Sequence, residues 1–240
     1  MKPKKIDDER TKITKPFSYE KMKFRYKYVS KFLNKGSVLD IGCGHAYGLK
    51  YLPECNYTGI DYYQPALDDA KKMFPDANFL QMTLPNLNFE NETFDNILCL
   101  EFIEHITREE GEILLKEAHR VLKKGGKFFL TTPNSDNKNG IWRDHILEYS
   151  KKEMESMIQK EGFFIEKFSG MLDSTLWKGL QKLKPEKGDS SQSRTGSFSL
   201  RTHNPITKTI LRIIANLVIY IGYYRPNKAI HQMYVCRRTP

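Results

Sequence analysis

A glycine-rich turn after a short apolar run is the part of the sequence best suited to binding chemistry. The run Ser37–Ile41 contains Asp40 near its end, and Gly42 and Gly44 follow directly. Glycine is needed where the backbone turns sharply and a ligand approaches it closely. Asp61 closes a second apolar run 19 residues after Gly42, the spacing at which a carboxylate meets ribose hydroxyls. The pattern therefore predicts a site for a nucleoside-containing ligand.

Short apolar runs alternate with helical patterns around this turn, which is typical of βαβ units. We predict an α/β fold with a Rossmann-like, seven-stranded, mostly parallel sheet and helices on both faces. A helical and loop insertion is expected between the last two strands. The predicted strands are 37–41, 57–61, 78–81, 96–100, 127–132, 163–168 and 231–237.

Several helix boundaries have local signals. Two capping-box patterns predict helix starts, Thr107 with Glu110 and Ser150 with Glu153. Gly125 and Gly162 stand where helices are expected to end. An N-terminal helix over 19–33 would carry the apolar stripe Met22, Tyr26, Val29 and Leu33. A polar, Ser-rich stretch, 184–205, predicts a mobile loop before an apolar helix over 206–222.

Four segments in this order resemble a known family. VLDIGCGHAYG, GID, FDNILCLEFIEHI and RVLKKGGKFFLTTPN resemble the successive motifs of class I S-adenosylmethionine-dependent methyltransferases. The closest likeness is to ubiquinone-biosynthesis O-methyltransferases and to sugar and natural-product O-methyltransferases. It spans residues 20–170 and resumes at 231–238. It implies S-adenosyl-L-methionine as the cofactor.

The resemblance also implies roles for individual residues. Gly42 and Gly44 would lie under the methionine and ribose of the cofactor, Asp61 would bind the ribose hydroxyls, and Tyr62 would flank the adenine. Met82 and Thr83 occupy the place of a Gly-Asp pair that meets the adenine edge in relatives. Leu100 would lie beside the methionine portion, and Arg25 resembles an arginine that pairs with the cofactor carboxylate. Asp40 is included in this set, either as a direct contact or as an anchor of the turn.

Methyl transfer to a hydroxyl also needs a base, and histidine is the natural one near neutral pH. His45 lies in the glycine turn, His105 follows the fourth predicted strand and His145 follows the fifth. We favour His145 as the general base, with His105 second, because the segment after the fifth strand usually faces the acceptor. Glu101 would support the sulfonium electrostatically. No metal is predicted, because the acidic pairs do not repeat with ligand spacing.

Charge patterning bears on the methyl acceptor. Net charge is +8 over residues 1–35, −7 over 36–170 and +9 over 171–240, within a total of +10. Basic flanks attract anionic partners. The first hypothesis is O-methylation of a small anionic or glycan-type acceptor, a class that includes nucleotide- and lipid-linked molecules. An RNA methyltransferase and a non-catalytic S-adenosylmethionine-binding protein are the alternatives, and a peripheral membrane contact through 206–221 is a further one.

Composition sets the remaining expectations. We expect a core, 36–170, a basic N-terminal helix within 1–35 over the cofactor, a basic lid, 171–230, and a final core strand, 231–240. The four cysteines form no Cys-x-x-Cys pair, and the first residues lack an apolar signal segment. The expected location is the cytoplasm, with the inner face of a membrane as a variant.

Overall fold

The sheet has the order β3-β2-β1-β4-β5-β7-β6 in the computed structural model, which describes residues 16–137, 141, 144–176 and 205–239. All neighbouring strands are parallel except that β7 runs antiparallel to both β5 and β6. The strands are β1 Ser37–Ile41, β2 Asn56–Asp61, β3 Asn78–Gln81, β4 Phe94–Leu100, β5 Leu122–Pro133, β6 Phe163–Asp173 and β7 Ala229–Arg238. The predicted Rossmann-like fold is confirmed.

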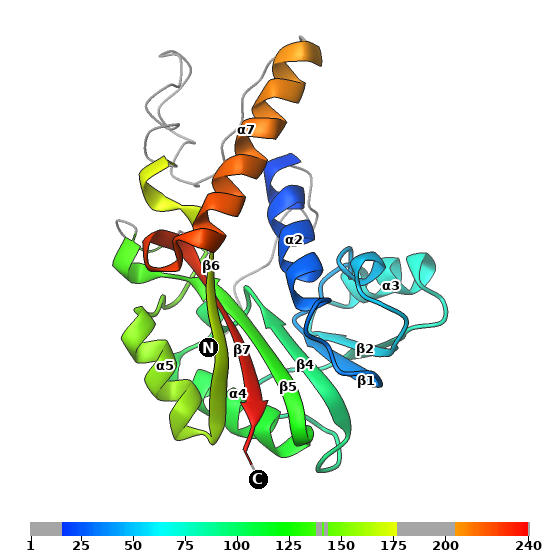
Figure 1. Cartoon of the computed structure of the whole chain (residues 1–240). Helices are drawn as coiled ribbons and strands as arrows, with labels where there is room; N and C mark the ends of the chain where they lie inside the picture. The colour runs from blue at the N-terminus through cyan, green and yellow to red at the C-terminus, as the bar shows by residue number, and fades with distance from the viewer. Residues whose placement is uncertain (1–15, 138–140, 142–143, 177–204, 240) are drawn as a thin grey trace.

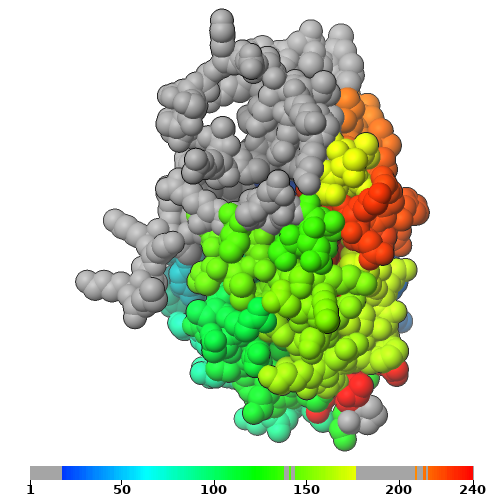
Figure 2. All heavy atoms as spheres, turned by 90° about the vertical axis from the view of Figure 1, so that its left-hand side faces the viewer, coloured from blue at the N-terminus to red at the C-terminus, as the bar shows by residue number. Residues whose placement is uncertain are grey.

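Helices cover both faces of this sheet (Figure 1). One face packs against α4 Arg108–Val121 and α5 Lys151–Lys160 through a core that includes Ile97, Leu115 and Met154. The other face meets α2 Pro16–Val29, α3 Gln64–Met73 and α7 Pro205–Tyr224. The 3-10 turns are η1 Leu49–Tyr51, η2 Ile103–His105, η3 Ser135–Asn137 and η4 Pro226–Lys228. Figure 2 shows the face over α5 in yellow-green.

The helix-start predictions hold at atomic detail. The Thr107 and Ser150 side chains accept from the backbone N–H groups of Glu110 and Glu153, whose carboxylates accept in return. Gly162, at φ +83°, directly follows the C-cap of α5, as predicted. The prediction for Gly125 is wrong, because α4 ends at Val121 and the chain passes directly from Leu122 into β5.

The insertion between β6 and β7 contains α7, which lies beside α2 (Figure 1). Val218 and Ile219 are buried against the sheet, whereas Ile213 and Leu217 are more than half exposed. The face of α7 that contains Val218 and Ile219 therefore packs on the domain, and the face that contains Ile213 and Leu217 is exposed. Most of the predicted loop, 184–205, lies outside the described residues. In the described part of the chain, no helix is long and apolar enough to cross a membrane.

Candidate functional site

The glycine turn directly follows the end of β1, at the carboxyl edge of the sheet. Gly42 and Gly44 have φ values of +70° and +52°, a region that favours glycine. A Cβ added at Gly42 would lie 2.3 Å from the Phe102 ring, so this glycine lets the segment after β4 pack against the turn. A Cβ added at Gly44 would meet no described atom within 4 Å. The side of Gly44 on which a Cβ would stand is therefore open to a ligand.

Asp61 ends β2 directly beside this turn. Its Oδ2 accepts from the Gly44 N–H at 2.9 Å, and its Oδ1 accepts from the Tyr63 N–H at 2.9 Å. Burial raises the pKa of Asp61, and the backbone N–H groups of Tyr63 and Gly44 offset part of this rise. Each oxygen keeps a further lone pair, so the carboxylate can still accept from a ligand hydroxyl.

Asp40 lies beneath the turn and is 1% exposed. Its Oδ2 accepts from the hydroxyls of Tyr26 and Tyr57 at 2.7 and 2.8 Å. Burial raises its pKa to about 6, against the opposing effect of these two hydrogen bonds. Through these two hydrogen bonds Asp40 connects α2 and β2 to β1, as an anchor of the turn would.

The other predicted cofactor residues are spread along the same edge. Tyr62 is 40% exposed next to Asp61, and its carbonyl accepts from the Gln81 side chain at 3.0 Å. The Met82 N–H donates to the Asp61 carbonyl at 2.9 Å, and Thr83 is exposed. Leu100 ends β4 and is partly buried against the core on the α2 side. Tyr62 and Met82 thus border Asp61, and Thr83 directly follows Met82.

Arg25, which was predicted to pair with the cofactor carboxylate, contacts a carboxylate of the chain itself. Its Nη1 lies 3.4 Å from Glu101 Oε2, and the same oxygen lies 2.7 Å from His231 Nδ1. Burial alone would raise the pKa of Glu101, but Arg25 and His231 hold it well below the usual range. Burial and then Arg25 lower the pKa of Lys21, also on α2, to about 8. An anionic carboxylate surrounded by basic groups therefore occupies the end of β4.

His231 and Lys21 were missed in the sequence. His231 is the third residue of β7, pairs in register with Pro133 of β5, and is fully buried. Burial lowers its pKa to about 4, against the opposing effect of Glu101, so the ring is neutral near pH 7. No local motif marks it. Its position depends on β7 running antiparallel, which places the start of that strand beside the carboxyl end of β5.

Glu104 lies close to the two histidines that were predicted to be catalytic, His105 and His145, at the same edge of the sheet. One ligand atom each from Glu104, His105 and His145 lies within 4.8 Å of the others. His145 Nδ1 is 2.6 Å from Glu148 Oε1, and His105 Nδ1 is 3.0 Å from the Asp144 carbonyl oxygen. The Ile146 N–H donates to the Glu104 carbonyl at 2.8 Å, which fixes the segment after β5 against η2. The structure thus unites the two predicted catalytic residues.

His45 is separated from this group. It is 2% exposed, its ring stacks on Tyr47, and its Nδ1 lies 3.5 Å from Asp69 Oδ2 on α3. These contacts place His45 on the α3 side of the glycine turn rather than beside His105 and His145.

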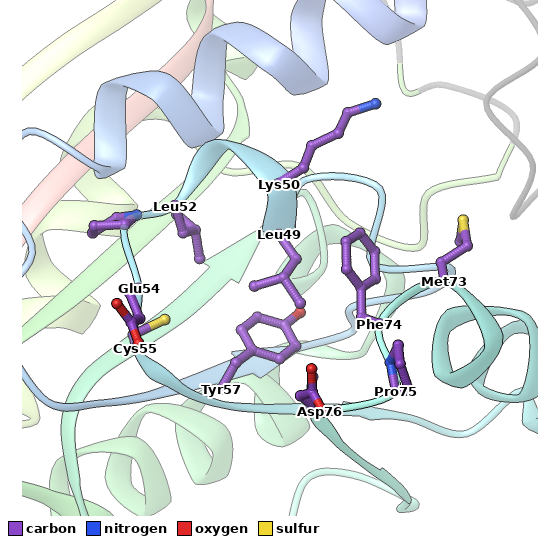
Figure 3. Close-up of a pocket in the computed structure, with 12 residues that line it drawn as sticks. Leu49, Lys50, Leu52, Glu54, Cys55, Tyr57, Met73, Phe74, Pro75 and Asp76 are labelled. Atoms are coloured by element: carbon purple, nitrogen blue, oxygen red, sulfur yellow. The ribbon is translucent and has the colours of Figure 1, made fainter.

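A cavity of about 370 Å³ lies at another place in the molecule (Figure 3). Its lining includes Leu49 and Leu52 near η1, Cys55 before β2, and Phe74 after α3. None of the residues described above as candidate site residues lines it. It is therefore not the site that the glycine turn and Asp61 form.

Comparisons with known proteins agree with this geometry. Residues 39–130 match the methyltransferase-domain family. This methyltransferase-domain segment holds the glycine turn, Asp61 and the Glu101–His105 stretch. The fold is that of S-adenosylmethionine-dependent methyltransferases. One such structure, from Archaeoglobus fulgidus, superimposes with a TM-score of 0.57 at 14% identity, covering 92% of this chain and 94% of that one.

Curated relatives carry related names. A protein of Mycolicibacterium smegmatis named "Probable S-adenosylmethionine-dependent methyltransferase" is 26% identical over 64% of this chain and 60% of its own length. A phthiotriol/phenolphthiotriol dimycocerosates methyltransferase of Mycobacterium tuberculosis is 32% identical over 44% of this chain and 40% of its own length. The chain thus spans about half the length of the curated relatives it matches.

The fold alone does not decide the reaction. The [4+2]-cyclase SpnF superimposes with a TM-score of 0.58 at 14% identity, covering 92% of this chain and 81% of that one. The methyltransferase-domain match over residues 39–130 and the fold imply S-adenosylmethionine as the cofactor. The residues fit it, since Gly44 offers backbone that a Cβ would block and Asp61 offers acceptors for two adjacent hydroxyls.

Proposed function

We propose that the chain is an S-adenosylmethionine-dependent O-methyltransferase acting on a small anionic or glycan-type acceptor, a class that includes nucleotide- and lipid-linked molecules. The observation that carries the cofactor part is the Gly44 turn, bound to the Asp61 carboxylate at the end of β2. Gly42, Gly44, Asp61, Tyr62, Met82, Thr83 and Leu100 would hold the cofactor. When bound, it supplies a sulfonium methyl group, whose carbon–sulfur bond breaks as the acceptor oxygen attacks.

The acceptor hydroxyl needs a group that takes its proton. The His145 ring has Nδ1 2.6 Å from Glu148 Oε1, and Glu148 is 6% exposed. A carboxylate that accepts from Nδ1 keeps the proton there and leaves the Nε2 lone pair as the base. In this proposal Nε2 of His145 takes the hydroxyl proton and Glu148 positions the ring.

The acceptor class rests on charge. The flanks, 1–35 and 171–240, carry net charges of +8 and +9. An anionic acceptor would be attracted to such basic flanks. The relative named phthiotriol/phenolphthiotriol dimycocerosates methyltransferase gives a precedent for an acceptor of the kind that its name states. On α7 an exposed apolar stripe would contact a lipid-linked acceptor; it consists of Ile213, Leu217, Tyr220 and Tyr224.

Calorimetry with the purified chain tests the cofactor assignment. We expect S-adenosylmethionine and S-adenosylhomocysteine to bind with micromolar dissociation constants, while NADH and FAD give no heat. Binding of a nicotinamide or flavin nucleotide in place of both would refute the proposal. Transfer of a labelled methyl group to a panel of sugar phosphates, nucleotide sugars and phenols then tests the acceptor class.

A further inference from the structure

The cavity beside η1 and the end of α3 is a second concave site, which none of the candidate cofactor residues lines (Figure 3). Its volume of about 370 Å³ is within the range of small-molecule sites, about 300–1,000 Å³. Much of its lining is apolar, with Leu49, Leu52, Tyr57 and Phe74 among its residues. Tyr57 is 5% exposed, and the other three are partly buried. This lining suits a flat apolar or aromatic group.

The rim of the cavity carries charges of both signs, but only its carboxylates are available to a ligand. The Lys50 ammonium lies over the Tyr19 and Tyr51 rings, 5.2 and 5.4 Å from their centroids. Lys50 is thus held toward α2, and Figure 3 shows it pointing away from the apolar side chains. Glu54 and Asp76 are exposed, and neither carboxylate has a hydrogen bond or ion pair within the described ranges.

Lys71 on α3 also approaches this rim, and its ammonium is bound to the backbone. Its Nζ donates to the Pro75 and Ala77 carbonyls at 2.8 Å each. These two bonds fix the turn that carries Asp76. A cationic ligand group at the rim would therefore meet carboxylates without ion pairs, and an anionic group would be repelled by them.

Two parts of the lining connect the cavity to the candidate cofactor site. η1 continues the glycine turn, because the Leu49 N–H donates to the Ala46 carbonyl at 3.0 Å. The Ala46 N–H in turn donates to the Cys43 carbonyl at 2.9 Å. The Tyr57 hydroxyl donates at 2.8 Å to Asp40, which anchors the same turn. A ligand that contacts Leu49 and Tyr57 would therefore hold the turn in two places.

We propose that this cavity is an effector site for a small aromatic amine, whose binding tightens the binding of the cofactor. The aromatic part would pack on Phe74 and Tyr57, and the ammonium would lie near Glu54 and Asp76. An occupied cavity orders η1 and the turn in advance, so the cofactor has less chain to order when it binds. Amine binding itself is independent of the proposed O-methyltransferase function, whereas the coupling rests on the cofactor site of that proposal.

Calorimetry on the full chain with tryptamine as the probe measures binding of the amine. We expect a dissociation constant of about 1 mM or below, which is ordinary for a ligand of this size. Indole-3-propionate has a similar shape and the opposite charge, and it should bind about tenfold more weakly. Equal affinity for the two probes, or no heat with tryptamine, would overturn the proposal.

Cys55 reports whether the probe occupies this cavity. It is one of the lining residues and is partly exposed, whereas Cys43, Cys99 and Cys236 are buried. Tryptamine should slow the alkylation of Cys55 by iodoacetamide in proportion to its occupancy, as measured by peptide mass spectrometry. Alkylation at an unchanged rate in saturating tryptamine would place the probe elsewhere and contradict the assignment.

Substitution of the two rim carboxylates tests the recognition of the ammonium. The double variant Glu54→Gln, Asp76→Asn should bind tryptamine about 5- to 20-fold more weakly. Both side chains are exposed, so its melting temperature should match that of the parent. Asp68→Asn is the matched control, because this exposed carboxylate on α3 does not line the cavity. Equal tryptamine affinity in the double variant and the parent would refute an amine as the ligand.

Titration of S-adenosylhomocysteine with and without saturating tryptamine tests the coupling. We expect the dissociation constant to fall by about fivefold or more when tryptamine is present. An unchanged constant would refute the effector role. A chain that binds tryptamine but no S-adenosylhomocysteine would retain the amine site and refute the proposed cofactor site, so the two failures are distinguishable.

Discussion

At the scale of single residues, Asp61 is the side chain on which cofactor binding should depend most. Both carboxylate oxygens accept from backbone N–H groups, at Gly44 and Tyr63. Asp61→Asn turns an NH2 group toward one of these donors and removes an acceptor for the ribose. We expect S-adenosylhomocysteine to bind about 10- to 100-fold more weakly, or roughly 1–3 kcal/mol, as measured by calorimetry.

The control is Asp68→Asn, an exposed carboxylate on α3 that should leave the affinity unchanged. Similar affinity for Asp61→Asn and the parent would remove Asp61 from the cofactor site.

His145 carries the second residue-scale prediction. His145→Ala should lower turnover by about 10²–10⁴-fold with little change in cofactor affinity, because its proposed role is on the acceptor side. Single-turnover methyl transfer with a hydroxylated acceptor from the panel measures this. His45→Gln is informative beside it, since His45 faces α3 and should affect turnover much less. Comparable rates for His145→Ala and the parent would shift attention to His105.

At the scale of elements, the buried Asp40 carboxylate controls how α2 and β2 attach to β1. Its folded pKa of about 6 is above the ordinary value of 3.8, so the folded chain holds this proton more tightly than the unfolded chain. The stability it contributes is present below pH 4 and is lost as the pH rises through 6. Relative to Asp40→Asn, we expect the free energy of unfolding to fall by roughly 2–3 kcal/mol across this window.

Urea denaturation of both proteins at several pH values between 4 and 7 measures that difference. The amide can still accept from Tyr26 and Tyr57, so the variant isolates the proton. Parallel pH profiles for the two proteins would mean that Asp40 titrates normally.

At the scale of the whole molecule, the two basic flanks around an acidic middle separate the acceptor classes. An RNA enzyme would bind bulk RNA tightly, with log K falling by about 0.7 for each phosphate contact on a single strand as log salt rises. We expect weak binding both to bulk RNA and to anionic liposomes across a salt series. Tight, salt-steep RNA binding would favour the RNA methyltransferase instead.

Liposome binding that is lost in Leu217→Ser and Tyr220→Ser, but kept in Thr209→Ser, would assign the exposed stripe of α7 to a membrane. Sedimentation with vesicles of anionic and neutral composition makes the comparison. Both substituted apolar residues are more than half exposed, so neither change should disturb the core.

Much of the framework was determined by local sequence. The runs that form β1 and β3 were predicted to the residue, because a buried strand with its flanking turn is encoded within a few positions. Both capping boxes involve residues three apart, so they form wherever the helix starts. The spacing from Gly42 to Asp61 likewise belongs to one βαβ unit, and the structure joins its two ends by the Gly44–Asp61 hydrogen bond.

Tertiary structure decided what surrounds that unit. The sequence did not show that Glu101 meets Arg25 and His231, or that Glu104 and His105 meet His145, because these partners are separated by 40 to 130 residues. Their contact depends on β7 inserting antiparallel between β5 and β6, and on the backbone of Ile146 binding to that of Glu104. The glycine turn and Asp61 depend on residues that are close in sequence, so the sequence predicts them. The charged side chains and histidines beside them come from distant segments, so they meet only when the strands pair.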